Sequence, residues 1–410
     1  MCLVVNKIRE HRDRQDLIMA LKVLDLCTGL GAFTVAGRAV GGFESVCGSE
    51  IDKFCCKHME QNLKLENSGD VRYLATDEIP NSTQKYLDED KVPAEWESFS
   101  QFTMADFMEG VVPWPNMVCA GSPCQNITSV NINGNALGID GEKSKVIYDV
   151  MNVVENLEPE YVLLENGPLL TNKGLDVLLR KFGLLEYQVE WNVVSCACFG
   201  FPHYRHRLFI FAARKDSPIA KTHRSIFKLV SEDACYLPGE VVPTFNMYTQ
   251  EQIDKLYLET PRSIKGRSLR INALGNSIVY PVAKSHMRAV KTLHFLECNS
   301  DTKCDFEDGV EIKVGTKIPD EGYMINGKIF KRPRDFRLNP KKTEFENMSS
   351  TLLRKDGNNN FNPSRLERPG KSGGVNTDLM RAFGFNGGGF HPEWAEAYMG
   401  YPQKFTDVNQ

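Results

Sequence analysis

The stretch Val118-Cys-Ala-Gly-Ser-Pro-Cys-Gln-Asn-Ile-Thr-Ser129 joins an apolar run to a loop. The run 116–120 is closed by glycine and proline, a pattern typical of a buried strand that ends in a loop. In a parallel α/β sheet, ligands bind at the carboxyl ends of the strands. Cys124 follows this strand directly, where a nucleophile would be useful. Free cysteines are more often buried packing residues, however, so Cys124 alone does not decide between the two roles.

Four further segments change that balance. They are the glycine-rich turn Asp25-Leu-Cys-Thr-Gly-Leu-Gly-Ala-Phe33, the pair Glu165-Asn166 after an apolar strand, the paired arginines of Pro202-His-Tyr-Arg-His-Arg207, and Gly275-Asn276-Ser277. Together with Pro123-Cys124-Gln125 they resemble the DNA (cytosine-5-)-methyltransferase family, in an arrangement similar to its phage-type members. The resemblance implies an α/β fold, namely a Rossmann-like S-adenosylmethionine-dependent methyltransferase domain with a smaller, irregular target-recognition domain.

The first part of the chain reads as a cofactor site. We expect a strand at 21–26, a tight turn at 28–31, a helix from Thr34, and a second strand that ends in Glu50. An acid about 20 residues beyond a glycine-rich turn typically binds ribose hydroxyls. A dinucleotide enzyme would also have such a turn, but the third glycine of its usual pattern is missing.

The resemblance assigns cofactor-binding roles along the chain. Glu50 is expected at the ribose of S-adenosylmethionine and Ile51 against its adenine. Asp70 is favoured over Asp106 as the acid on the adenine side. The other residues expected to line the cofactor are Leu26, Gly29, Leu30, Gly31, Phe33, Pro123, Asn276 and Ser277.

The resemblance also implies a reaction. A thiolate of Cys124 adds to carbon 6 of cytosine and makes carbon 5 electron-rich, which splits one difficult step into two easier ones. Glu165 donates a hydrogen to N3 and Arg207 donates to O2. Asn166 orients the base or the loop, and Arg205 positions a phosphate or Glu165. The cytosine must first be swung out of the duplex.

Length and composition limit the possible domain number, location and partners of the protein. A chain of 410 residues is expected to form two domains. It lacks an apolar stretch long enough for a membrane span, and its 12 scattered cysteines suggest reduced thiols in a cytoplasmic protein. The resemblance to phage-type members implies a bacterial or phage-infected cell. No metal-ligand spacing stands out. A net charge of −4 does not by itself indicate nucleic-acid binding. The segment Tyr323–Gly373, however, carries 12 Lys/Arg against 5 Asp/Glu.

The domain map follows from these motifs. We expect a catalytic domain at 20–285, a target-recognition domain at 286–390, and a bracing helix in 391–410. Strands at 187–194 and 207–213 should form a hairpin, and a helix should open near Leu274 with Asn276 or Ser277 as its cap. Double-stranded DNA is the expected partner of a monomer, with a cognate restriction endonuclease as a candidate second partner. A tRNA methyltransferase and a catalytically silent DNA-binding protein are the alternatives.

Overall fold

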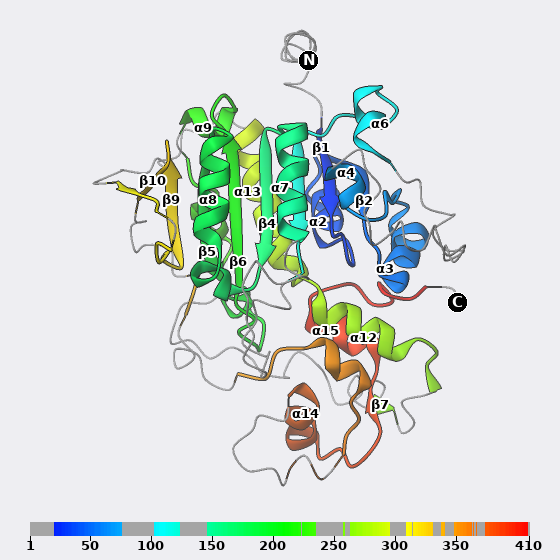
Figure 1. The fold of residues 1–410 in the computed structure, drawn as a ribbon. Coiled ribbons are helices and arrows are strands. Elements are labelled where there is room, and N and C mark those ends of the chain that lie inside the picture. The colour runs from blue at the N-terminus through cyan, green and yellow to red at the C-terminus, as the bar shows by residue number, and fades with distance from the viewer. Residues whose placement is uncertain are drawn as a thin grey trace.

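The computed structural model describes most of the chain (Figure 1). The described residues are 20–75, 102–123, 146–222, 224–234, 257–258, 263–295, 309–313, 315–330, 338–340, 348–362, 364, 366 and 374–408. Cys124, the predicted nucleophile, lies outside them, as does the glycine- and asparagine-rich loop 131–144.

The centre of the molecule is a mixed sheet. Among the described residues its strand order is β2-β1-β3-β4-β6-β5-β9-β10-β8. The parallel half consists of β1 (Leu21–Leu26), β2 (Phe43–Ser49), β3 (Met117–Gly121) and β4 (Tyr161–Asn166). Next to β4, β6 (Arg207–Arg214) runs antiparallel and pairs with β5 (Tyr187–Val194), which confirms the predicted hairpin.

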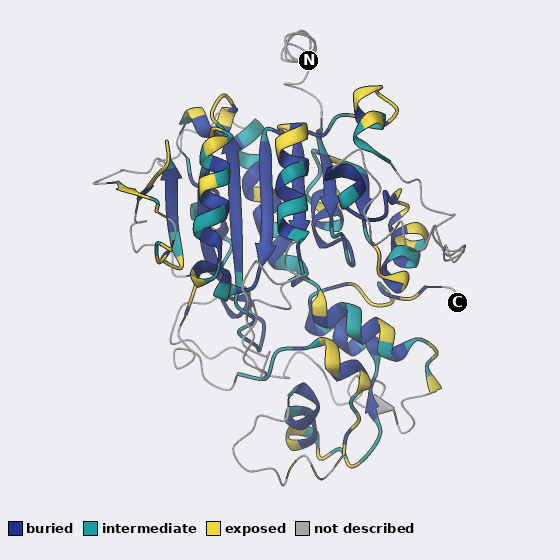
Figure 2. Cartoon of the chain, viewed as in Figure 1, coloured by how far each residue is buried: buried dark blue, intermediate teal, exposed yellow. Residues whose placement is uncertain are grey.

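Helices cover both faces of this sheet, which confirms the predicted α/β class. Alternate residues of β4 face opposite ways: Tyr161 and Leu163 belong to one core cluster, Val162 and Leu164 to the other. The first cluster is completed by α2 (Ala32–Val40) and α13 (Tyr280–Phe295), the second by α7 (Val146–Leu157) and α8 (Leu175–Leu184). Figure 2 shows the strands buried beneath helices whose outer faces are exposed. Near-continuous apolar strands are what burial on both faces requires.

Shorter elements fill the connections. They are α3 (Lys53–His58), the π-helical turn η2 (Met59–Leu63), α4 (Arg72–Ala75), α6 (Met104–Met108), η4 (Pro168–Asn172), η5 (Cys196–Phe199), α9 (Pro218–Thr222) and α10 (Ile226–Glu232). None of the helices in the described part of the chain is long and apolar enough to cross a membrane.

A lower lobe lies beyond the end of the sheet toward which β4 points (Figure 1). It contains α12 (Arg267–Asn276), η7 (Arg354–Asn358), α14 (Val375–Phe383) and α15 (Pro392–Tyr398), with β7 (Tyr257–Leu258) paired to β11 (Gly389–Phe390). Backbones pack closely here: a Cβ at Gly275 would lie 2.3 Å from the carbonyl carbon of Leu353. α15 falls inside the predicted bracing segment.

Two expectations need correction. A helix was expected to open near Leu274, but α12 ends at Asn276, Ser277 is extended, and α13 begins only at Tyr280. Asn276 and Ser277 therefore close one helix instead of capping the next, and Pro281 sits in the first turn of α13, where proline is tolerated.

The predicted boundary at 285/286 falls inside α13. In addition, β9 (Glu321–Ile325) pairs with β5, and β10 (Lys328–Phe330) and β8 (Val310–Glu311) continue the same sheet. This part of 286–390 is therefore continuous with the catalytic sheet. The recognition role of the rest stays a prediction.

Candidate active site

The acid and the arginine predicted to act on one base lie together. Glu165 is the fifth residue of β4, and Arg207 opens the neighbouring strand β6. Arg207 Nε lies 2.9 Å from Glu165 Oε1. The residue opposite Glu165 in β3 is Gly121, and a Cβ there would lie 3.7 Å from Glu165 Oε2. The pair thus sits at the carboxyl ends of β3 and β4, just before the segment that leads to Cys124.

The Glu165 carboxyl group is buried, with 8% of the residue exposed. Burial raises its pKa, and the nearby charges of Arg207 and Arg205 oppose that rise. A carboxyl group that keeps its proton more readily than a free glutamate can donate a hydrogen bond to a ring nitrogen. The geometry and the direction of this shift both suit the role predicted for Glu165.

Asn166 was predicted to orient the base or the loop, and it is bonded to the residue that precedes Pro123. It is 2% exposed, and its Nδ2 donates to Ser122 Oγ at 2.8 Å and to the Ser122 carbonyl at 3.3 Å. Its Oδ1 accepts from Gly167 N at 2.7 Å. Asn166 therefore fixes the chain two residues before Cys124. Ser122 was missed as a site residue, and nothing in the sequence pattern distinguishes it.

Arg205 has a different position from the one expected. Its guanidinium donates to the carbonyls of Leu352 at 2.8 Å, Gly275 at 2.9 Å and Ser277 at 2.5 Å. The residue is 4% exposed and has φ 30°. These carbonyls occupy donors that a phosphate would need, so Arg205 ties the lower lobe to the sheet, and its charge acts on Glu165.

The segment that carries both arginines is anchored by His203. Its ring lies 3.1 Å from Cys196 Sγ and 3.1 Å from the Tyr398 carbonyl. Burial lowers the pKa of His203 to about 3, so the ring is neutral. Ser195 Oγ donates to the Tyr204 carbonyl at 2.6 Å. The segment that leads to Arg205 and Arg207 is thus held in place by these contacts, one of them with α15.

The glycine-rich turn and the predicted ribose acid also meet. Gly29 N donates to Glu50 Oε2 at 2.6 Å, and the other carboxyl oxygen accepts from Ile51 N and Asp52 N at 2.8 Å each. Gly29 and Gly31 have φ of 55° and 69°, which glycine tolerates. Among the described residues, a Cβ at Gly29 would have only the Cys27 carbonyl within 4.0 Å. Backbone that is open on this side suits a closely approaching ligand.

Other predicted cofactor residues divide into two groups. The side chains of Leu26, Leu30 and Phe33 are buried in the cores, whereas Ile51 is 53% exposed beside Glu50. Asn276 is exposed and Pro123 half-buried. Ser277 Oγ lies 2.5 Å from Tyr401 OH.

Asp25 was missed. It is 1% exposed, and its Oδ2 accepts from Thr34 N at 3.2 Å and Thr34 Oγ1 at 2.7 Å. Burial raises its pKa to about 7. By bonding the start of α2, Asp25 holds both sides of the glycine-rich turn. The available signal was an acid in the middle of an otherwise apolar strand.

Of the two adenine-side candidates, the structure places Asp70 beside the cofactor strands. Ser49 Oγ at the end of β2 donates to the Gly69 carbonyl at 2.7 Å, and Arg72 Nε donates to Asp70 Oδ1 at 2.9 Å. Asp106, in contrast, forms a capping box with Thr103 at the start of α6. This geometry favours Asp70 for the predicted contact.

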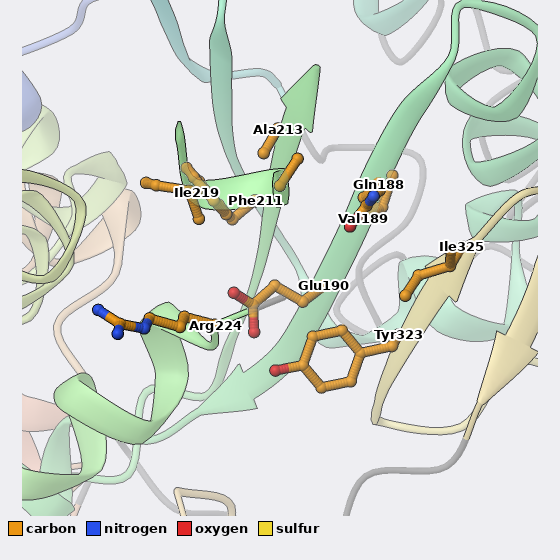
Figure 3. A pocket seen from close by; sticks show the side chains of 10 residues that line it. Gln188, Val189, Glu190, Phe211, Ala213, Ile219, Arg224, Tyr323 and Ile325 are labelled. Carbon is orange, nitrogen blue, oxygen red and sulfur yellow. The ribbon is translucent and has the colours of Figure 1, made fainter. Parts of the chain in front are cut away.

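A separate pocket lies on the sheet near β9 (Figure 3). Its lining includes Glu190, Arg224 and Tyr323 but none of the predicted site residues. The Glu190 carboxylate accepts from Ser225 Oγ and Ile226 N at 2.8 Å each, so it caps α10.

Within the described ranges, no group of three or more His, Cys, Asp or Glu residues is arranged to hold a metal ion.

Comparison with known proteins now adds to this geometry. Residues 21–87 and 96–273 match the family described as C-5 cytosine-specific DNA methylase, which is more than half of the chain. The chain therefore belongs to the C-5 cytosine-specific DNA methylase family, a family of enzymes. This confirms the resemblance seen in the motifs.

Individual relatives are distant. Type II methyltransferase M.DsaV of Dactylococcopsis salina is 24% identical over 280 residues, 67% of this chain and 66% of its own. M.HhaI of Haemophilus parahaemolyticus is 24% identical over 211 residues, 50% of this chain and 53% of its own. The chain thus spans about half to two thirds of these relatives. Among solved structures, Entamoeba histolytica EhMeth is 16% identical with a TM-score of 0.33, covering 47% of this chain and 53% of its own.

Proposed function

We propose that this protein transfers a methyl group from S-adenosylmethionine to carbon 5 of a cytosine swung out of double-stranded DNA. The observation that carries the proposal is the buried Glu165 carboxyl group, paired at 2.9 Å with Arg207 at the strand ends that lead to Cys124. Family membership supplies the class of reaction, and this pair supplies the means of activating a pyrimidine ring.

The proposed reaction begins with Cys124. Its thiolate forms a bond to carbon 6 of the cytosine while N3 takes a proton from Glu165. Carbon 5, now the nucleophilic end of an enamine, takes the methyl group as the bond from that methyl to the sulfonium sulfur breaks, which leaves S-adenosylhomocysteine. A water molecule then takes the proton from carbon 5, the double bond between carbons 5 and 6 re-forms and expels the thiolate, and the ring returns its N3 proton to Glu165, which restores the enzyme. Covalent addition replaces one difficult step by two easier ones.

The two side chains around the base have distinct tasks. Glu165 supplies the proton because burial raises its pKa. Arg207 holds the Glu165 carboxyl group and would donate to O2, where negative charge develops. Asn166 acts indirectly, through its hydrogen bonds to Ser122, by fixing the approach of the Cys124 segment.

The cofactor residues fit the proposed ligand. Gly29 offers open backbone, Glu50 presents a carboxylate beside it, and the exposed Ile51 gives an apolar surface for a ring. Asp70 would face the adenine amino group. When bound, S-adenosylmethionine supplies an electrophilic methyl group. We further assign DNA recognition to the part of 286–390 in the lower lobe, in a monomeric cytoplasmic protein, with a restriction endonuclease as a candidate partner.

One labelling experiment tests the proposal. The protein is incubated with S-adenosylmethionine tritiated in the methyl group and an equimolar mixture of duplex DNA and tRNA, with the Cys124→Ser variant as control. We expect label at carbon 5 of cytosine in the DNA and none with the variant. Label on tRNA alone would show that the substrate is tRNA and not DNA. Absence of label on both would contradict the proposed activity.

A further inference from the structure

The segment Tyr401–Val408 runs from α15 back toward the cofactor side of the sheet. It follows Gly400, where φ is 76° and a Cβ would lie 2.5 Å from Pro281 Cδ and 2.8 Å from Phe201 Cζ. The residue before the segment is therefore packed between Pro281 of α13 and Phe201. Nothing in the proposed reaction uses it, yet its contacts lead to two parts of the predicted cofactor site.

One end of the segment is fastened by an asparagine far away in the sequence. Asn62 Nδ2 donates to the carbonyls of Phe405 at 2.8 Å and Asp407 at 2.9 Å. His58, one turn earlier, packs edge-on against the Phe405 ring with centroids 4.7 Å apart. Asn62 lies on the π-helical turn η2, and single π turns often mark functional sites.

The same turn supports the glycine-rich cofactor loop. A Cβ at Gly31 would lie 2.4 Å from Leu63 Cδ1, so Leu63 packs directly against Gly31. Arg38 NH1 donates to the Leu63 carbonyl at 2.6 Å, which joins the turn to α2. Asn62 therefore connects the segment Tyr401–Val408 to Gly31 through its immediate neighbour in the chain.

The other end of the segment holds the Gly-Asn-Ser motif. Tyr401 OH lies 2.5 Å from Ser277 Oγ and donates to the Ile278 carbonyl at 2.9 Å. The Tyr401 ring stacks on the Phe405 ring with centroids 4.5 Å apart. This stack joins the contacts that Tyr401 makes with Ser277 to those that Phe405 makes with Asn62.

A buried ion pair stiffens the connection. Arg270 NH2 donates to Glu396 Oε1 at 2.8 Å, and the same oxygen accepts from Thr406 N at 2.9 Å. Arg270 and Glu396 are 5% and 0% exposed. The segment is thus locked to α12 and α15 between its two cofactor-side anchors.

We infer that Asn62 and Tyr401 are positioning residues for cofactor binding, because they fasten the segment Tyr401–Val408 between the glycine-rich turn and the Gly-Asn-Ser motif. The inference rests on the proposed function for the identity of the cofactor. Neither residue takes part in the methyl transfer itself. Their loss should weaken cofactor affinity while leaving the chemical step and DNA binding as they are.

The test measures the dissociation constant for S-adenosylmethionine by calorimetry, without DNA. In Asn62→Asp, which has nearly the same shape, an oxygen replaces the donor and faces two carbonyl oxygens. Tyr401→Phe keeps the ring stack and loses the hydroxyl. We expect each to weaken binding by about three- to tenfold. The matched controls are Glu60→Gln, exposed on the same turn, and Lys404→Ala in the segment, both with wild-type affinity.

Steady-state kinetics and thermal unfolding complete the test. We expect KM for S-adenosylmethionine to rise with the dissociation constant, while kcat at saturating cofactor and KM for DNA stay within about twofold of wild type. Unchanged affinity in both variants would overturn the inference, as would a loss confined to kcat or to KM for DNA. If the wild-type protein itself bound no S-adenosylmethionine, the proposed function would fail first, and the inference with it.

Discussion

Arg207 Nε and Glu165 Oε1 lie 2.9 Å apart, on the neighbouring antiparallel strands β6 and β4, where Phe209 is the residue opposite Glu165. Pairing with Arg207 and the proposed role of Glu165 require opposite protonation states of the Glu165 carboxyl group. The arginine favours the charged carboxylate, whereas a proton donor to cytosine N3 must hold its proton. Burial is the largest influence on Glu165 and raises its pKa, with Arg207 as the main opposing charge. In the proposed mechanism, the pair therefore sets a pH limit on activity.

Removal of Arg207 should move that limit. The active form of Glu165 is protonated, so its contribution is present below its pKa and lost as pH rises through it. Arg207→Met removes the opposing charge, which raises that pKa further and shifts the alkaline limb of the single-turnover rate to higher pH. The rate at its optimum should fall by about 10²- to 10³-fold, since a donor to O2 is lost.

The companion variant is Glu165→Gln, which cannot titrate. We expect it to lose the alkaline limb and to turn over slowly at every pH. An alkaline limb that stays in place in both variants would show that another group sets it.

Asn166 should control the rate of chemistry without touching the base. Asn166→Ala removes both hydrogen bonds to Ser122 and loosens the chain before Cys124. A single-turnover rate about tenfold lower, at unchanged DNA affinity, corresponds to the loss of such positioning. Asn172→Ala, an exposed asparagine on η4, serves as the matched control and should behave as wild type. Weakened DNA binding with an unaltered rate would argue against this role.

Arg354 and Lys355 are expected to contact DNA phosphates. Both are exposed at the start of η7, next to Leu352, whose carbonyl Arg205 holds at 2.8 Å. Loss of two phosphate contacts should lower the slope of log K against log salt by about 1.8, because each contributes about 0.9. The double variant Arg354→Ala/Lys355→Ala is compared with Arg180→Ala, an exposed cation on α8, by titrating DNA binding at several salt concentrations. Equal slopes in all three proteins would remove η7 from the interface.

Short-range sequence patterns correctly predicted the buried strands and the residues that lie at their ends. The apolar runs at 116–120 and 161–164 became β3 and β4, because strands buried on both faces need near-continuous apolar residues. The motifs also brought Gly29 to Glu50 and Glu165 to Arg207, since each lies at a strand end.

Long-range packing accounts for what the sequence did not reveal. Arg205 looks like its neighbour Arg207, but carbonyls from Gly275 and Leu352 surround it, and no local pattern indicates them. The pairing of β9 with β5 is likewise invisible in a short strand with a glycine in it. The order of the motifs led to a boundary at 285/286, whereas the continuous helix α13 crosses it.

Gly275 should be needed for stability at the junction of the lobes. A methyl group there would lie 2.3 Å from the Leu353 carbonyl carbon and 2.4 Å from Arg354 N, so η7 could not keep its place on α12. We expect Gly275→Ala to lower the free energy of unfolding by about 1–3 kcal/mol. Chemical denaturation measures it, with the exposed Leu269→Ala on the same helix as control. A Gly275→Ala protein as stable as wild type would mean that the two segments separate readily.

The central claim is that Cys124 bonds to the ring of a cytosine that Glu165 and Arg207 activate. The most direct measurement is trapping on duplex DNA in which 5-fluorocytosine replaces cytosine, because fluorine at carbon 5 cannot leave as a proton does and the adduct persists. In the presence of S-adenosylmethionine we predict a complex stable to denaturing electrophoresis, whose cross-linked peptide contains Cys124, and no complex with Cys124→Ser. An adduct at another residue, or no adduct with a wild-type protein that binds both DNA and cofactor, would contradict the account.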